Sequence, residues 1–234
     1  MRLDKFLSDM GIASRKELRQ IIKSGRVSVN GAAASAPEMK IDPAADEISM
    51  DGRRLLYSRF HYYMLDKPTG VLSVTEDRKQ STVLDLVTPE MRRMGLFPVG
   101  RLDKDTSGLL LLTDDGDFAH RVISPKSGVE KQYYARVDGS LDAEDVSAFA
   151  LGLTLGDGTK CLPAKLELLD EGSCLVTVME GKYHQVRRML ASRGAPVLEL
   201  RRLSIGALIL DESLGPGGFR ELDQTELDKV FNAT

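Results

Sequence analysis

Tryptophan is absent from this sequence of 234 residues, cysteine occurs only twice, and aromatic residues make up only 6%. The core must therefore be built mainly from aliphatic side chains. The two cysteines, Cys161 and Cys174, have neither CxxC nor Cys/His ligand spacing, which argues against a structural zinc and a disulfide framework. No apolar run approaches the roughly 20 residues of a membrane span. These absences disfavour a membrane protein and a disulfide-rich secreted protein, and they predict no metal site.

The amino-terminal segment MRLDKFLSDMG places two aspartates among apolar residues and has no small-residue cleavage site. It does not fit a signal peptide and, together with the cysteine content, predicts a cytoplasmic protein. With 42% hydrophobic and 29% charged residues, the chain suits one large domain, or a large and a small one. We expect a monomer.

The net charge of −3 conceals a segregation of charge along the chain. Residues 1–30 hold seven cations and three anions, and residues 182–202 hold six cations and one anion. Residues 138–181 hold nine acidic residues and two lysines. Two basic segments with an acidic one between them are typical of a protein that holds a polyanion on one side, although solvated helix faces would give the same pattern.

Residues 1–58 are predicted to form a small domain of their own. Apolar residues at helical spacing indicate a helix over 3–10, and a capping box at 14–17 opens a second helix. A strand-like alternating segment then runs into Asn30-Gly31, a strong short-range signal for a β-hairpin. Residues 48–50 are expected to form the last strand of this domain, after an Ala/Pro-rich loop.

This amino-terminal stretch resembles the RNA-binding domain named after ribosomal small-subunit protein four. The Ser-Arg pair that opens the second helix and the closing Val-Asn-Gly both match. The resemblance implies binding to structured RNA but names no reaction, because such domains occur on many proteins. The candidate RNA-binding residues in this domain are Arg2, Arg15, Lys16, Arg19, Lys23 and Arg26.

Residues 59–234 form the second predicted domain, in which short β-rich segments dominate without a regular βαβ alternation. The expected fold is α+β, with a mixed, mainly antiparallel sheet, flanking helices and a central cleft. The predicted strands are 61–66, 71–74, 109–113, 132–137, 164–169 and 174–179. The predicted helices are 83–87, 118–123, 143–151, 184–193 and 224–231.

The segment from Gly95 to Gly116 combines a polar loop with the apolar run 109–112. A loop attached to a buried strand is a rigid place for reactive groups. If the loop is extended from Arg101 to Asp103, the two side chains project to the same side, and the guanidinium favours the ionised carboxylate. An ordinary surface ion pair would explain an isolated Arg-Leu-Asp equally well.

A second polar cluster, from Glu180 to Leu190, is expected to follow a strand and begin a helix. His184 lies three and four residues before Arg187 and Arg188, so these side chains would share one helix face. A basic amphipathic helix with a structural histidine is the plainer interpretation. A third candidate, Tyr133, begins a strand and on its own would be half-buried sheet filler.

Taken together, these segments resemble the three signatures of the RsuA family of pseudouridine synthases. They are the Gly-Arg-Leu-Asp103 loop with its Thr-Ser-Gly-Leu-Leu-Leu-Leu-Thr continuation, the Glu-Lys-Gln-Tyr133 strand, and Gly-Lys-Tyr-His184-Gln-Val-Arg-Arg-Met. Lys67-Pro68-Thr69-Gly70 matches a fourth, earlier segment of that family. Four matches in the same order over nearly the whole chain are far more specific than any one of them.

The resemblance implies isomerisation of a uridine already present in RNA, without ATP, a metal or a redox cofactor. It implies that Asp103 is the essential carboxylate, acting as nucleophile or as proton abstractor at the sugar. Arg187, or its neighbour Arg188, would keep Asp103 charged and oriented. Tyr133 would stack on the flipped uracil, and its phenol is a candidate for the final proton removal. Arg101 is a candidate to occupy the space that the base leaves.

The expected partner is ribosomal RNA or a ribosomal precursor particle, contacted by Arg101, His184 and Arg188. Tyr183-His184 before Gln-Val looks more like family members that act on small-subunit 16S rRNA, because relatives acting on the large subunit often carry Asn-Arg there. A synthase acting on 23S rRNA and a non-catalytic ribosome-assembly factor stay open as alternatives. A glycosidase is disfavoured, because Asp105 is too close in sequence to serve as the second acid.

Overall fold

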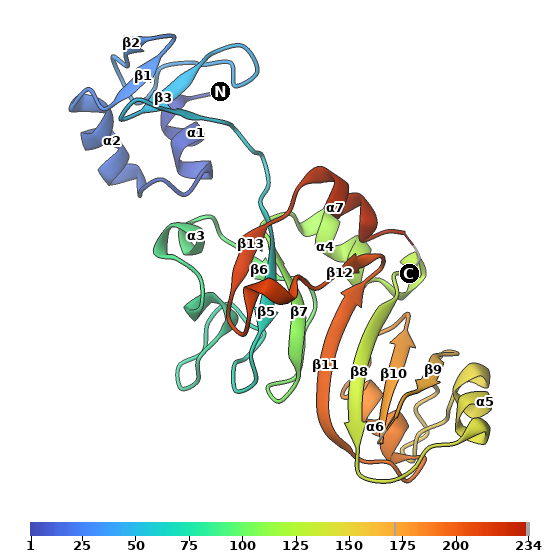
Figure 1. Ribbon diagram of the computed structural model, residues 1–234. Coiled ribbons are helices and arrows are strands. Elements are labelled where there is room, and N and C mark those ends of the chain that lie inside the picture. Colours follow the sequence, from blue (N-terminus) through green and yellow to red (C-terminus); the bar gives the residue numbers. More distant parts are fainter. Residues whose placement is uncertain (171, 233–234) are drawn as a thin grey trace. The chain divides into compact units, whose positions relative to one another are not determined.

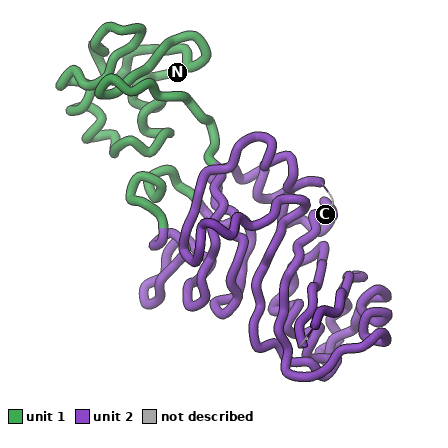
Figure 2. The backbone as a smooth tube through the Cα atoms, viewed as in Figure 1, with its two compact units in different colours: residues 1–61, 87–96 green, residues 62–86, 97–234 purple. Residues whose placement is uncertain are grey.

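The computed structural model describes residues 1–170 and 172–232, and the chain divides into two compact units (Figure 2). Unit 1 consists of Met1–His61 and Val87–Leu96, and unit 2 of Tyr62–Leu86 with the chain from Phe97 onward. The sequence predicts a domain boundary between residues 58 and 59. That boundary between domains 1–58 and 59–234 stays a prediction.

Unit 1 combines three short helices with a four-stranded antiparallel sheet in the order β2-β1-β3-β4 (Figure 1). The helices are α1 (Leu3–Asp9), α2 (Arg15–Lys23) and α3 (Pro89–Arg93). The strands are β1 (Val27–Val29), β2 (Ala32–Ala33), β3 (Ile48–Met50) and β4 (Arg53–Leu55). Because β4 follows β3, the prediction that residues 48–50 form the last strand of this region is wrong.

Local signals in the sequence explain how these elements begin and end. The Ser14 side chain accepts a hydrogen bond from the Glu17 amide, and Glu17 accepts one from the Ser14 amide, so the predicted capping box is present. Asn30 and Gly31 have φ values of 52° and 81° and join the antiparallel strands β1 and β2. Positive φ at both turn positions suits Asn-Gly and gives the hairpin its predicted turn.

Unit 2 is built on a nine-stranded sheet with the order β13-β5-β7-β11-β8-β10-β9, while β12 pairs with β11 and β6 with β7. Only β7 and β11 pair in parallel among these strands, so the predicted α+β fold with a mixed, mainly antiparallel sheet is confirmed. The strands are β5 (Tyr62–Lys67), β6 (Phe97–Pro98), β7 (Ser107–Thr113), β8 (Lys131–Val137), β9 (Lys165–Leu168), β10 (Ser173–Val178), β11 (Val197–Ile205), β12 (Leu208–Ile209) and β13 (Phe219–Glu221).

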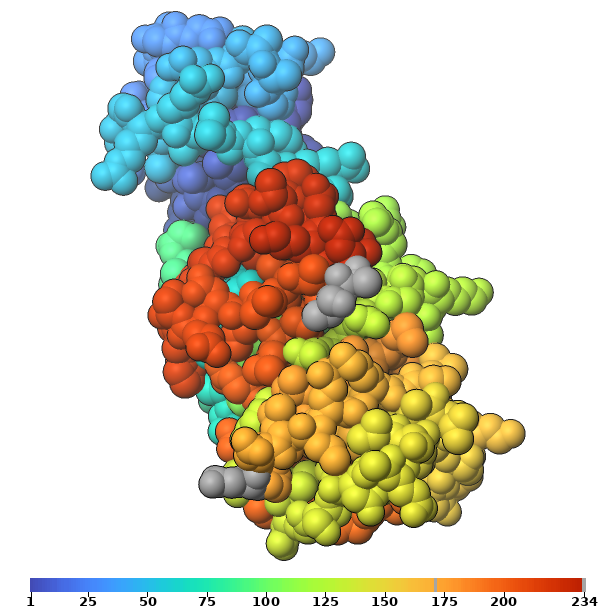
Figure 3. Space-filling model, turned by 45° about the vertical axis from the view of Figure 1, so that its right-hand side comes forward, coloured from blue at the N-terminus to red at the C-terminus, as the bar shows by residue number. Residues whose placement is uncertain are grey.

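The helices of unit 2 lie at two places along this sheet (Figure 1). They are α4 (Gly116–Ile123), α5 (Ala143–Leu151), α6 (Gln185–Ala191) and α7 (Gln224–Lys229), with 3₁₀ turns η1 (Val83–Asp85), η2 (Pro125–Ser127) and η3 (Glu212–Leu214). One apolar cluster lies beneath α5 and α6, and another beneath α4 and α7. The surface of the α4 segment adjoins that of the carboxyl-terminal segment, where the Phe118 and Phe231 rings pack edge to face (Figure 3).

In unit 2, two predicted elements differ in type from the structure, and the longest strand is missing from the prediction. Residues 71–74 form a loop in which only Leu72 makes a β-bridge, and the helix predicted over 83–87 is a 3₁₀ turn. The longest strand, β11, is absent from the predicted set, because its two internal arginines make its sequence read as a basic surface segment. Among the described residues, no helix is long and apolar enough to cross a membrane.

Gly108 allows the parallel pairing of β7 and β11. It has φ +103°, and a Cβ atom there would lie 2.2 Å from the Arg202 carbonyl oxygen and 2.7 Å from the Arg202 nitrogen. We predict that Gly108→Ala lowers the free energy of unfolding by more than about 3 kcal/mol, because backbone atoms have to move apart. Gly116→Ala, where a Cβ meets nothing within 4 Å, is the matched control. Equal urea midpoints for the two variants would contradict this prediction.

Candidate active site

Asp103 lies in the loop between β6 and β7, next to three neighbouring cavities. One cavity of about 740 Å³, here called the Tyr183 cavity, is lined by Asp103, Tyr183 and His184 together with Thr69, Leu72 and Ser73. A hollow of about 70 Å³ is lined by both Asp103 and Tyr133. A further cavity of about 470 Å³, the Tyr133 cavity, contains Tyr133, Lys131 and Arg202. Asp103 therefore lines one cavity with His184 and a neighbouring hollow with Tyr133.

Lys67 holds the Asp103 loop from below. Its side chain is fully buried at the end of β5, and its Nζ donates hydrogen bonds to the carbonyl oxygens of Asp103 (3.1 Å) and Thr106 (2.9 Å), as well as to that of Pro68 (3.0 Å). Burial lowers the pKa of Lys67 to about 8, against the pull of Asp105 and Asp103, which raise it. The Lys67 ammonium thus fixes the backbone of the Asp103 loop through these hydrogen bonds.

The segment after Lys67 adds two further contacts to the same loop. The buried Ser73 hydroxyl donates to the Leu102 carbonyl (2.8 Å) and accepts from the Leu102 amide (3.1 Å). The Gly70 amide donates to the Lys104 carbonyl at 2.7 Å. Residues on both sides of Asp103 are therefore held through their backbone, and none of these contacts uses the Asp103 carboxylate.

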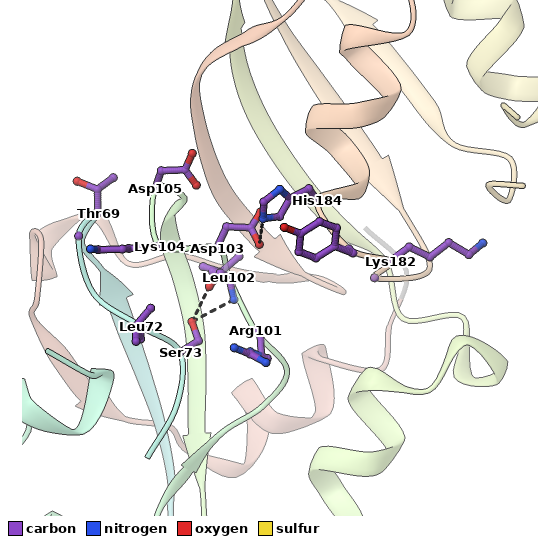
Figure 4. A pocket seen from close by; sticks show the side chains of 13 residues that line it. Thr69, Leu72, Ser73, Arg101, Leu102, Asp103, Lys104, Asp105, Lys182 and His184 are labelled. Carbon is purple, nitrogen blue, oxygen red and sulfur yellow. Dashed lines mark hydrogen bonds and ion pairs between the residues drawn. The ribbon is translucent and has the colours of Figure 1, made fainter. Parts of the chain in front are cut away.

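His184 is the neighbour of the Asp103 carboxylate (Figure 4). Its Nε2 lies 3.4 Å from Asp103 Oδ1. His184 precedes α6 as the N-cap residue and has φ 46°, a left-handed conformation that is strained for a residue other than glycine. The prediction that His184 belongs to the helix is therefore wrong. The turn instead directs its ring toward Asp103.

The predicted partnership of Arg187 with the Asp103 carboxylate is not what the structure shows. Arg187 Nη2 lies 3.2 Å from the Asp105 carboxylate and donates to the Asp105 carbonyl (3.1 Å) and to Thr106 Oγ1 (3.4 Å). It thus holds the far end of the Asp103 loop. Arg188 is directed elsewhere, with its Nη2 2.6 Å from Asp157. Arg101 is exposed, lines the cavities on both sides, and points away from the Asp103 carboxylate in Figure 4.

Tyr133 stands on β8 and packs against the apolar cluster beneath α5 and α6. Arg202 on β11 is its direct neighbour across the sheet, and Arg202 Nη1 donates to the Tyr133 hydroxyl at 3.4 Å. Arg202 Nε also donates to the Leu109 carbonyl on β7 at 2.7 Å, so this guanidinium joins Tyr133 to the strand that follows Asp103. Lys131, buried at the start of β8, has its pKa lowered to about 8 by burial and by Arg202.

A carboxylate holds the turn that carries Tyr183 and His184. Buried Glu180 accepts hydrogen bonds from the Leu162 amide (2.9 Å) and Gln185 Nε2 (2.8 Å), and it pairs with Lys182 Nζ at 2.6 Å. Burial alone would raise the pKa of Glu180, but these donors outweigh it and hold the pKa below its ordinary value. The turn is therefore shaped before any substrate binds.

The predicted RNA-binding residues of unit 1 lie at its surface. Four of them are exposed on α2, and these are Arg15, Lys16, Arg19 and Lys23. Arg2 forms an ion pair with Asp4 at 2.7 Å, and Arg26 forms one with Asp51 at 2.5 Å. The α2 cations are thus better placed to meet phosphates than the two residues that already have carboxylate partners.

Comparison with known proteins identifies the family. The RNA pseudouridylate synthase model matches residues 61–192, and the S4 domain model matches residues 1–48. The chain therefore belongs to the RNA pseudouridylate synthase family. It is a pseudouridine synthase, an isomerase, that carries an S4 RNA-binding domain. Within the described part of the chain, no three His, Cys, Asp or Glu side chains are grouped so as to hold a metal ion.

Relatives match over the full length of the chain. An uncharacterized RNA pseudouridine synthase of Bacillus subtilis is 46% identical over 97% of both chains. The ribosomal small subunit pseudouridine synthase A of Vibrio cholerae is 40% identical, covering 99% of this chain and 100% of its own. A crystal structure of a pseudouridylate synthase superposes with a TM-score of 0.69 and 37% identity, covering 98% of this chain and 99% of its own. The resemblance to the RsuA family is confirmed.

Several residues that position the site carry no clear signal in the sequence. Lys67 belongs to the Lys-Pro-Thr-Gly segment that matches the family, but a lysine in a sequence does not reveal that its ammonium binds the carbonyl oxygens of a loop. Ser73 lies in a segment whose sequence predicts a strand. Arg202 lies in a segment whose sequence predicts a basic surface. Arg202 lies on the buried face of β11 between Leu200 and Ser204, and because two of these three residues are polar, the sequence shows no apolar alternation that would reveal a buried strand.

The Lys67 contacts predict a large effect on stability. We expect Lys67→Met to lower the free energy of unfolding by about 2–4 kcal/mol, because three loop carbonyls lose a donor. Urea unfolding measures this, with the exposed Lys126→Met as control. If Lys67→Met and Lys126→Met lower the free energy of unfolding equally, Lys67 does not hold the loop as proposed.

The same substitution predicts a dependence on pH. The pKa of Lys67 is about 8 in the folded state and near 10.5 in the unfolded state, so the unfolded chain binds more protons between these values. The stability of the wild type relative to Lys67→Met should therefore rise from pH 8 to 10.5. A relative stability that falls over this range would show that Lys67 is not buried as its environment indicates.

Proposed function

We propose that this enzyme converts a specific uridine of small-subunit 16S rRNA to pseudouridine, with Asp103 as the essential carboxylate. The observation that carries the proposal is the position of Asp103: its loop is held through the backbone on both sides, and its carboxylate lies beside His184 and a hollow shared with Tyr133. A group that must meet the sugar of one nucleotide needs such fixed placement.

The reaction is an isomerisation in which the uracil changes its point of attachment. The bond between N1 and C1′ of the ribose breaks, the base turns, and C5 bonds to C1′. N1 gains a proton and C5 loses one, so the elemental composition does not change. Because a stacked base cannot turn, the uridine has to flip out of its helix at a cost of a few kcal/mol.

Asp103 acts at the sugar, where an ionised oxygen has to lie about 3 Å from the reacting centre. The side chain of Asp103 is 30% exposed, so bound RNA has to complete the exclusion of water. Arg187 supports this role by holding the Asp105–Thr106 end of the loop rather than by pairing with the Asp103 carboxylate itself.

Tyr133 provides the surface for the flipped uracil. Its ring lines the hollow that it shares with Asp103, and the contact between its hydroxyl and Arg202 keeps the ring in place. The hydroxyl is also the group proposed to remove the proton from C5 at the end of the reaction. Arg101, exposed between the cavities, is proposed to enter the space that the base leaves.

The choice of 16S rRNA is supported by two observations. Relatives named for the ribosomal small subunit match this chain along its full length, and Tyr183-His184 stands before Gln-Val in the segment that opens α6. The S4 domain supplies a second RNA-binding surface through the cations of α2. We infer that ribosomal RNA or its precursor particle is the partner.

The first prediction of this proposal concerns Asp103. In cells that lack the gene, a single uridine of 16S rRNA should be unmodified, and the wild-type protein or the exposed control Asp117→Asn should restore pseudouridine there. Asp103→Asn should not, although its binding to 16S rRNA fragments is retained, because only the ionised oxygen is removed. Restoration of the pseudouridine by Asp103→Asn would show that this carboxylate is not essential for the reaction. If the cells without the gene instead lack a pseudouridine of 23S rRNA, the proposed 16S rRNA substrate is wrong.

The second prediction concerns α2. Combined substitution of Arg15, Lys16 and Arg19 by Ala should weaken RNA binding and flatten its salt dependence, by about 0.7–0.9 in the log–log slope for each phosphate that the protein no longer neutralises. Titration of a 16S rRNA fragment at several salt concentrations measures both. An unchanged slope would show that α2 does not face the phosphates.

A further inference from the structure

Tyr183 presents an aromatic ring to solvent directly beside the proposed catalytic group. The residue is 76% exposed, and it lines the Tyr183 cavity. The ring stacks on that of His184, with centroids 3.9 Å apart and planes at 16°. Since His184 in turn contacts Asp103, the two stacked rings extend from the carboxylate toward solvent.

The main chain holds this pair in place. Glu180 and Gln185 shape the turn from within, and the strained backbone of His184 directs its ring to Asp103. The Tyr183 carbonyl accepts from Arg188 Nη1 at 3.4 Å, while Arg188 is itself paired with Asp157. An exposed ring on such a turn loses little freedom when a flat ligand stacks on it.

The cavity beside this ring has the chemistry of a nucleotide site. At about 740 Å³ it is larger than the hollow shared by Asp103 and Tyr133. Leu72 and the Tyr183 ring give it apolar surface, and the exposed Arg101 and Lys104 are cations at its rim. Lys182 also lines the cavity but is paired with Glu180, and the carboxylates of Asp103 and Asp105 complete the charged lining. Apolar rings with nearby cations are what unstacked bases and their phosphates require.

We propose that Tyr183 is a stacking platform for the base of a nucleotide next to the target uridine. This inference rests on the proposed function, because it assigns two nucleotides of the same RNA to two aromatic side chains that line different cavities. Tyr133 receives the uracil that reacts, and Tyr183 receives an unpaired neighbour. Stacking on a neighbour holds the strand open and fixes the sugar of the target against Asp103.

The chemical class of this ligand is an unstacked nucleobase. Any base offers a flat π-face, and a purine covers more of the tyrosine ring than a pyrimidine does. The Tyr183 site is therefore expected to favour a purine neighbour without reading its hydrogen-bonding edge. The phosphates on either side of that base lie within the reach of the rim cations.

The experiment is a cycle that combines a protein change with an RNA change. Binding of a 16S rRNA fragment that contains the target is measured for the wild type, Tyr183→Ala and Tyr183→Phe, with an abasic residue placed before or after the target uridine. Leu151→Ala, an 84% exposed apolar residue of α5, is the control. Pseudouridine formation is measured in parallel.

We expect Tyr183→Ala to raise Kd about 5- to 150-fold and Tyr183→Phe to stay close to the wild type, because stacking on a base contributes about 1–3 kcal/mol. An abasic residue at one of the two neighbours should cost the wild type a similar factor and cost Tyr183→Ala nothing further. Equal decreases in affinity for both proteins at both positions, or an unchanged Kd for Tyr183→Ala, would overturn the inference.

Failure of the proposed function would give a different result. If the wild type forms no pseudouridine in the 16S rRNA fragment, the substrate assignment fails, while the binding cycle still decides whether Tyr183 stacks on a base. If pseudouridine forms and the cycle shows no coupling, the assignment stands and the Tyr183 platform fails.

Discussion

The placement of Asp103 depends on one buried charge. Lys67 reaches the loop from the end of β5 and satisfies carbonyl oxygens at residues 103 and 106, while Ser73 holds the residue between Arg101 and Asp103. An ammonium that gives up water for three carbonyls is stable only where all three stay in position. The loop and the buried lysine therefore require one another, and the backbone contacts fix the position of the carboxylate, whose Oδ1 also contacts His184.

The sheet of unit 2 explains why the cavities lie around this loop. Its apolar surface is divided into two clusters, one under α5 and α6 and one under α4 and α7. Strands β8 and β11 present Lys131, Tyr133 and Arg202, which are polar side chains on an otherwise apolar floor. Lys131 and Arg202 are buried, and Lys131 Nζ donates to the Val122 carbonyl of α4. Tyr133 is half-buried and lines the hollow that it shares with Asp103. Asp103 approaches these strands from the parallel neighbour of β11, because Gly108 lets β7 and β11 lie close together.

Much of the architecture could be predicted because local signals are strong. The α2 capping box, the Asn30-Gly31 hairpin and the ends of α5 follow from the sequence alone. Long-range pairing is what local patterns do not contain. Arg201 reads as a surface cation, yet it lies in β11 and pairs with the buried Asp66 at 2.9 Å. For the same reason the sequence indicated which residues gather at the site, but not that Arg187 pairs with Asp105 and leaves His184 beside Asp103.

The central claim is that the Asp103 carboxylate meets the sugar of a flipped uridine whose base lies against Tyr133. The most direct measurement is a crystal structure of Asp103→Asn bound to a 16S rRNA fragment that contains the target. We expect C1′ of that uridine within about 4 Å of the residue 103 side chain, with the uracil against the Tyr133 ring. A target sugar bound away from residue 103, with Tyr133 facing no base, would contradict the claim.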